Sequence, residues 1–93
     1  MRYVFTDSGF DSGCDLWKTL VFEEAKKAPG LIRMQLLSAK PMALAIGTWE
    51  DKKYAESFMR TGVFKKLKES LVGKLTAEPV SEHWTLDSVW EKA

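Results

Sequence analysis

Apolar residues recur at two spacings along the chain, and each spacing predicts a type of secondary structure. Residues 2–7 are aromatic and β-branched and stop at a stretch rich in Ser, Gly and Asp, which predicts a strand followed by a loop. Helical spacing comes next, and Ser12 or Asp15 is placed to cap a helix over about 15–28 that stops at Pro29-Gly30. The apolar stripe of this helix consists of Leu16, Trp17, Leu20, Val21 and Ala25.

The middle of the chain contains two short apolar runs. Residues 31–38 and 42–49 are joined by Ala-Lys-Pro, are bounded by turn residues and are too short for buried helices. They predict two strands paired in a hairpin. The second run ends in Trp49-Glu50-Asp51, where the chain turns directly into a helical pattern.

The last part of the chain predicts a helix in two segments and a final strand. Asp51 is placed to cap the helix, and Thr61-Gly62 interrupts an apolar stripe that ends at Gly73. Polar residues then alternate with Val80, Glu82, Trp84 and Leu86, which predicts a strand.

The resulting order, β-α-β-β-α-β, predicts an α+β fold. It is the order of a ferredoxin-like sandwich, in which one antiparallel sheet carries both helices on one face. At 93 residues the chain has the length of one domain, so we expect a single domain over 1–93.

The predicted hairpin is apolar on both faces, although two helices cover only one face of such a sheet. Alternation places Ile32, Met34 and Leu36 on one face, and Leu31 and Leu37 beside Arg33 and Gln35 on the other. Burial is worth about 25 cal/mol per Å², so leaving the second face in water forfeits several kcal/mol. A second copy of the sheet is the simplest cover, and we expect a homodimer with a two-fold interface.

Composition narrows the classes of partner. The net charge of +1 favours neither nucleic acid nor an anionic membrane. Cys14 is the single cysteine, so no intramolecular disulfide or Cys/His zinc cluster is expected. Its place near a predicted helix start raises the alternative of a lowered thiol pKa. The chain lacks a signal-peptide pattern and an apolar run of membrane-spanning length, so we expect a soluble, cytoplasmic protein.

Three stretches carry a resemblance to a known family: "APGLIRMQLL", "ALAIGTWEDKKYAESFM" and "GVFKKLKESL". In this order and spacing they resemble the antibiotic biosynthesis monooxygenase family of dimeric α+β barrels, over about residues 15–87. The resemblance implies a homodimer of face-to-face sheets with a pocket between sheet and helices in each subunit. It also implies oxygenation of an aromatic substrate without metal or flavin.

The haem-degrading branch of that family has a pattern that this sequence lacks. Phe58 stands at the position resembling the family's Trp, Lys68 stands at the position resembling its His, and the chain contains no Asn. A protonated lysine has no lone pair for iron. We therefore expect no cofactor.

Several side chains are candidates for a site, and each has a structural alternative. His83 is the only histidine and the natural general base, or else a solvent-facing strand residue. Arg33 is placed to hold a ligand's carboxylate or phenolate, or to pair across the dimer. Trp49 and Trp84 suit stacking on an aromatic ligand, or packing at a corner. The aromatic stripe that would line the pocket, or fill the core, contains Tyr54, Phe58 and Phe64.

The leading functional hypothesis is an oxidoreductase: a cofactor-independent monooxygenase acting on a small aromatic or apolar molecule. Arg33 and Trp49 would position the substrate, and His83 would act as base. The alternative from another class is a non-catalytic homodimeric module, either ligand-binding or structural, in which the same aromatics fill space. An isomerase or a decarboxylase using the same pocket is a third hypothesis.

Overall fold

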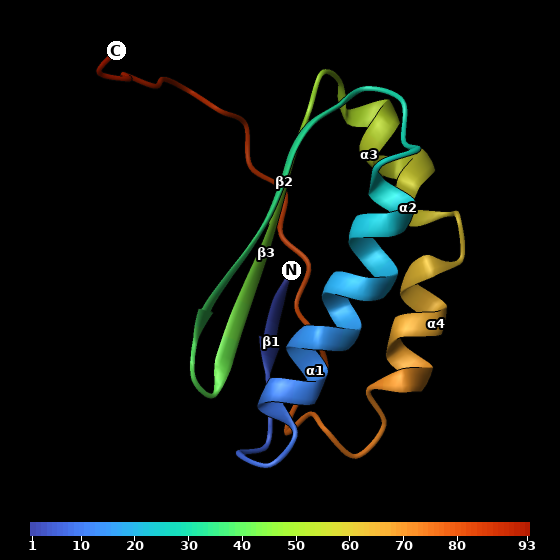
Figure 1. Ribbon diagram of the computed structural model, residues 1–93. Helices are drawn as coiled ribbons and strands as arrows, with labels where there is room; N and C mark the ends of the chain where they lie inside the picture. Colours follow the sequence, from blue (N-terminus) through green and yellow to red (C-terminus); the bar gives the residue numbers. More distant parts are fainter.

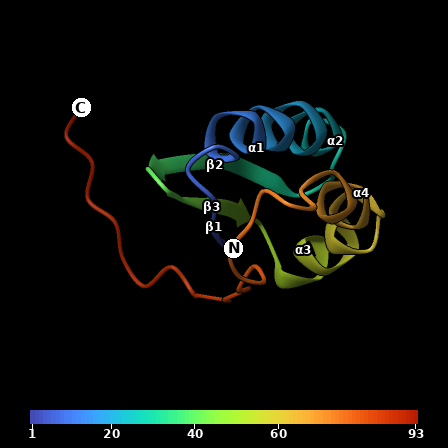
Figure 2. The ribbon, with the colours of Figure 1, turned by 90° about the horizontal axis from the view of Figure 1, so that it is seen from below.

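The computed structural model describes residues 1–93 and has an α+β architecture, as the sequence predicts. Its antiparallel sheet has the order β1-β3-β2, made of β1 (Arg2–Val4), β3 (Met42–Trp49) and β2 (Leu31–Ala39). All helices lie on one side of this sheet (Figures 1 and 2). The opposite side of the sheet carries no helix.

The β2–β3 hairpin confirms the predicted strand pair, with a bulge that the alternation did not predict. Leu31 pairs with Trp49 and Arg33 pairs with Thr48, so Ile32 is an extra residue on β2. The bulge reverses the expected faces at the start of the strand. Leu31 packs against the core, whereas Ile32 is 61% exposed.

The first helix starts earlier than its sequence pattern predicts. It runs without interruption through α1 (Phe10–Trp17), a π-helical turn η1 (Lys18–Phe22) and α2 (Glu23–Ala25). Neither Ser12 nor Asp15 is its cap, because both lie inside α1, and the N-cap position is Gly9. Tertiary packing explains the difference: Gly13 lies directly against the Phe5 ring, and Phe10 meets that ring edge-on at 5.9 Å.

The two-segment second helix is confirmed. Asp51 accepts a hydrogen bond from the Lys53 backbone N–H at 3.0 Å and so caps α3 (Lys52–Met59). Gly62 has φ +88° and separates α3 from α4 (Val63–Ser70). A positive φ favours glycine, which is why the break falls there.

The core lies between the helices and the covered face of the sheet. Trp17, Val21 and Ala25 from the first helix are buried, which confirms the inner part of its predicted stripe. They meet Tyr3 and Phe5 from the first strand segment. The remaining buried apolar residues are Cys14, Ala43, Phe58, Val63, Leu67 and Leu71.

The predicted final strand is wrong over most of its length. The chain after α4 forms isolated bridges, Leu75 with Phe5 and Val80 with Arg2, and the Thr76 N–H donates to the Val4 carbonyl at 2.8 Å, but residues 81–93 have no regular structure. Pro79 supplies no backbone N–H, which interrupts the ladder between the two bridges. Val80 already lies opposite Arg2, the first residue of β1, so β1 has no further residues with which the chain beyond Val80 could pair.

Candidate functional site

The predicted pocket aromatics form a packed column instead of an open pocket wall. Trp49 lies on the helix side of β3, where Gly47 leaves room for its indole, and contacts Phe58 with ring centroids 5.3 Å apart. Phe58 meets Phe64 edge-on at 5.6 Å. Trp49 thus packs within its own chain, at the corner where β3 turns into α3.

Tyr54 does not face a pocket, because its ring packs against the turn that precedes β2. Its ring covers Gly30, which has φ +77° and leaves no room for a Cβ atom. The Lys53 ammonium lies 5.2 Å from the centre of the ring. The contact fixes the chain between the first helix and β2.

The remaining predicted site residues lie elsewhere. Arg33 is exposed on β2 and, by its pairing with Thr48, belongs to the sheet face without helices. His83 and Trp84 are exposed in the C-terminal segment, where the Trp84 Nε1–H donates to Glu82 at 3.1 Å. The structure therefore brings Trp49, Phe58 and Phe64 together and separates them from Arg33 and His83.

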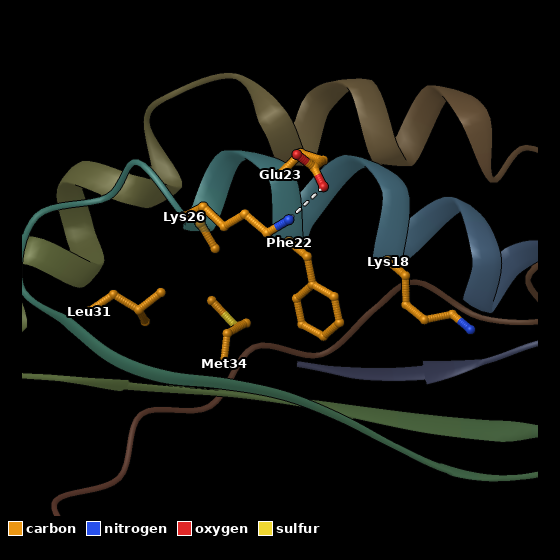
Figure 3. Close-up of a pocket in the computed structure, with 7 residues that line it drawn as sticks. Lys18, Phe22, Glu23, Lys26, Leu31 and Met34 are labelled. Atoms are coloured by element: carbon orange, nitrogen blue, oxygen red, sulfur yellow. Dashed lines mark hydrogen bonds and ion pairs between the residues drawn. The ribbon is translucent and has the colours of Figure 1, made fainter.

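The larger cavity lies between the first helix and the edge strand β2. It is a depression widely open to solvent, with a volume of about 370 Å³. Phe22 points from the helix toward the sheet and Met34 points from β2 toward the helix, so the two side chains face each other across it (Figure 3). Its complete lining is Lys18, Phe22, Glu23, Ala25, Lys26, Leu31 and Met34.

The charged groups of the larger cavity belong to side chains of the helix. The Lys26 ammonium donates to Glu23 at 2.8 Å, and this hydrogen bond holds the pKa of the Glu23 carboxyl below its usual value. Lys18 pairs with Asp15 at 3.2 Å. All four side chains are more than half exposed, so these ion pairs are solvated and exchangeable. The cavity thus combines an apolar interior with cations near its mouth.

A π-helical turn places the cavity's helix residues. Lys18 and Phe22 are its first and last residues. Single π turns occur frequently at functional sites because they redirect side chains away from the regular helical stripe. Phe22 lies outside the predicted stripe, and a large apolar residue in that position is the sequence signal that was available for this site.

Behind Phe22 lies a buried pair of hydrogen-bonded aromatic residues. Trp17 meets Phe22 edge-on at 5.0 Å, and the Trp17 Nε1–H donates to the Tyr3 hydroxyl at 3.3 Å. Tyr3 is only 2% exposed, and burial raises the pKa of its hydroxyl to about 12. The Tyr3 hydroxyl in turn donates to the Met1 sulfur at 3.5 Å.

Tyr3 also borders a smaller cavity of about 210 Å³ beside α4. Its ionic contact is between Lys68 and Glu78, 3.1 Å apart. The Met1 ammonium, nearby, donates to the Ala45 carbonyl at 2.9 Å, and burial lowers the pKa of this amine. The other lining residues are Phe64, Leu67, Leu71 and Pro79.

Cys14 does not behave as a helix-start nucleophile. It lies inside α1, four residues after Phe10, and is only 9% exposed. Burial raises the pKa of its thiol, which is opposite to the effect expected at a helix start.

Neither a metal site nor a membrane span is found. No group of three or more His, Cys, Asp and Glu side chains is close enough to hold a metal ion. No helix has both the length and the apolar character needed to cross a membrane. No protein-family model matches the chain, and a comparison with curated proteins finds no match.

Proposed function

We propose that the chain is a homodimeric, ferredoxin-like α+β barrel subunit that binds a small, mostly apolar, anionic molecule in the larger cavity. The observation that carries the proposal is that the lining of the cavity combines apolar side chains with charged ones. Phe22, Leu31 and Met34 offer apolar contact, while Lys18 and Lys26 supply cations that an anionic ligand would share with their solvated partners Asp15 and Glu23. Ligand sites typically combine an apolar lining with few polar groups that fix orientation, and their volumes start at about 300 Å³.

The fold supports the dimeric part of this proposal. The strand order β1-β3-β2, with the C-terminal segment bridged to the outer side of β1, is compatible with a ferredoxin-like sheet whose fourth strand is only begun. The side of the sheet without helices leaves Leu37 47%, Met42 52% and Ile46 38% exposed. A second copy of the chain on this side of the sheet would cover these residues.

Oxygenation of the bound molecule is the second candidate function, and the resemblance to the monooxygenase family motivates it. The observation that favours it is the wall formed by Phe22 with Trp17 behind it, because this wall suits a planar aromatic substrate and dioxygen is itself apolar. In a cofactor-free reaction, an activated CH₂ group and O₂ give a carbonyl group and water. The substrate then supplies all four electrons that O₂ accepts.

The candidate base does not reach the larger cavity in the single chain. His83 belongs to the exposed C-terminal segment and Arg33 to the other face of the sheet. Ligand binding without catalysis therefore has the stronger geometric support, and the monooxygenase hypothesis requires an assembly that moves His83.

Binding is tested with 1-naphthoate as the probe and ¹H–¹⁵N NMR as the readout. We expect shifts in the amides of Phe22, Ala25, Leu31 and Met34. Met34→Trp fills the cavity and should weaken binding at least about tenfold, a loss of ~1.4 kcal/mol. Met59→Trp is the matched control on exposed α3 and should leave the affinity unchanged. Equal affinity in both variants would contradict the proposal.

The role of the cations is tested with a second matched pair. Lys26→Gln should weaken 1-naphthoate binding about twofold to fivefold, as expected for a solvated ion pair. Lys27 is the adjacent lysine and does not line the cavity, so Lys27→Gln should have no effect. The uncharged probe 1-naphthalenemethanol should bind both variants equally.

Oxygenation is measured separately as dioxygen uptake with anthrone, whose CH₂ group would become the carbonyl of anthraquinone. The expected result is uptake above the buffer rate that is lost in Met34→Trp and retained in Met59→Trp. Binding without uptake would leave ligand binding as the function and exclude oxygenation of this substrate.

A further inference from the structure

The C-terminal segment, residues 81–93, holds large apolar side chains in solvent. Trp84, Leu86 and Trp90 are 83%, 69% and 81% exposed. All three positions are even-numbered, with Ser88 between Leu86 and Trp90, so these side chains lie in one row when the segment is a strand. The two tryptophans alone offer about 300–500 Å², which is as large as the largest apolar patch of a typical monomer, ~300–600 Å².

The segment's own chain does not cover this row. Val80 lies opposite Arg2, the first residue of β1, so the segment beyond Val80 has no further partner on that strand. Arg2 also forms an ion pair with Glu82, which holds the start of the segment next to β1. From there the segment runs away from the body, on the side of the sheet opposite the helices (Figures 1 and 2).

That same side of the sheet is the second uncovered apolar surface. We call it the open face, and define it as the side chains of β2 and β3 that point away from the helices. Its apolar residues are Leu37, Met42, Leu44 and Ile46. Among its β2 and β3 side chains Arg33 is the only charged one, so the rest of this face is neutral.

We propose that residues 81–93 of each copy bind across the open face of the second copy, so that the two C-terminal segments are exchanged in the dimer. This inference rests on the homodimer of the proposed function. Trp84, Leu86 and Trp90 would cover the partner's apolar residues. In an extended segment Asp87 and Glu91 lie on the opposite row, so they would face away from the partner's sheet, and Glu82 is already engaged by Arg2.

Reach and area both suit a second copy. Fully extended, residues 81–93 span about 40 Å, which is longer than the roughly 30 Å of the nine-residue strand β2 on the open face. The four tryptophans of two such segments would bury roughly 600–1,000 Å², a large share of the ~1,200–2,000 Å² of a stable interface. The open faces would supply the remainder.

Photo-crosslinking in the full chain tests the exchange. Trp84→p-benzoylphenylalanine places a reactive benzophenone in the row, and mixing ¹⁴N-labelled with ¹⁵N-labelled chains marks crosslinks between copies. We expect mixed-isotope dimers whose crosslinked peptide falls within residues 31–49. Val72→p-benzoylphenylalanine is the control, because Val72 is 78% exposed but lies after α4, away from the open face. It should give no such product.

Light scattering on the same samples separates the two proposals. A dimer with mixed-isotope crosslinks from Trp84 to residues 31–49 supports the exchange. A dimer in which Trp84 crosslinks only within its own chain, or outside 31–49, overturns the exchange and leaves the homodimer standing. A monomeric mass overturns both.

Discussion

At the scale of single residues, Tyr3 connects the strand, the first helix and the cavity region. Its hydroxyl accepts a hydrogen bond from Trp17 and donates one to Met1, and it is buried with no charged partner. Burial is the main reason that its pKa rises to about 12, because the phenolate would lose its hydration. The folded state therefore depends on Tyr3 remaining protonated.

This pKa predicts a loss of stability in strong base. Below pH 10 tyrosine is protonated in both the folded and unfolded states, so the full stability is present. Between pH 10 and about 12 only the unfolded state loses the proton, and unfolding is favoured by ~1.4 kcal/mol per pH unit. The total loss is about 3 kcal/mol. Urea unfolding at a series of pH values measures it.

Two variants assign the effect to one hydroxyl. Tyr3→Phe removes the titrating group and should flatten the stability profile relative to wild type between pH 10 and 12, after an initial loss of about 1 kcal/mol at pH 7 for the missing hydrogen bond. Tyr54→Phe should keep the wild-type slope. A Tyr3→Phe profile as steep as wild type would contradict the assignment.

At the scale of elements, Gly30 is the joint between the first helix, the hairpin and α3. Its φ of +77° turns the chain into β2, its carbonyl accepts a hydrogen bond from the Glu50 N–H at 2.8 Å, and the Tyr54 ring covers it. Two separate costs therefore oppose a side chain here. One is the left-handed backbone and the other is the collision with Tyr54.

Gly73 allows these two costs to be separated. It has φ +81°, but a Cβ atom would meet open space. Gly73→Ala should cost only the backbone term, about 1–2 kcal/mol. Gly30→Ala should add the cost of overpacking, a further ~1–3 kcal/mol. Urea unfolding measures both, and equal losses would show that Tyr54 moves aside freely.

The same elements show how far local sequence determines this fold. The Asp51 cap, the break at Gly62 and the hairpin follow from residues adjacent in the chain, and all were predictable. The helix start at Phe10 was not, because it depends on Gly13 fitting against Phe5, a contact between distant residues. Alternation also could not predict the bulge at Ile32, which shifts the pairing by one residue.

The candidate site was less predictable than the fold for a related reason. Aromatic content pointed to Trp49 and Phe58, yet these residues fill the core. The larger cavity depends on where a π turn places Phe22 and on the facing residue Met34. A π turn has no composition signal of its own. The location of the cavity therefore becomes visible only in the folded structure, where the helix and the strand are packed together.

At the scale of the whole molecule, the open face and residues 81–93 are two apolar surfaces on the same side of one chain. Neither is explained by the packing within that chain, since the helices lie on the other side of the sheet (Figure 2) and the core lies between them and the sheet. Their common side is what a two-fold assembly requires, because each copy then presents both surfaces to the other. Dimerisation should accordingly contribute to stability.

This contribution predicts a concentration-dependent unfolding temperature. Wild type should have twice the chain mass of 10.6 kDa by light scattering at micromolar concentration, and its unfolding temperature should rise with protein concentration because association stabilises only the folded state. Ile46→Lys places an ammonium in the centre of the open face. It should give a monomer whose unfolding temperature no longer depends on concentration, with the fold retained because Ile46 is 38% exposed in the single chain. Val72→Lys, away from that face, should remain dimeric. A wild-type mass of one chain at micromolar concentration would contradict the prediction, and so would a dimeric Ile46→Lys variant.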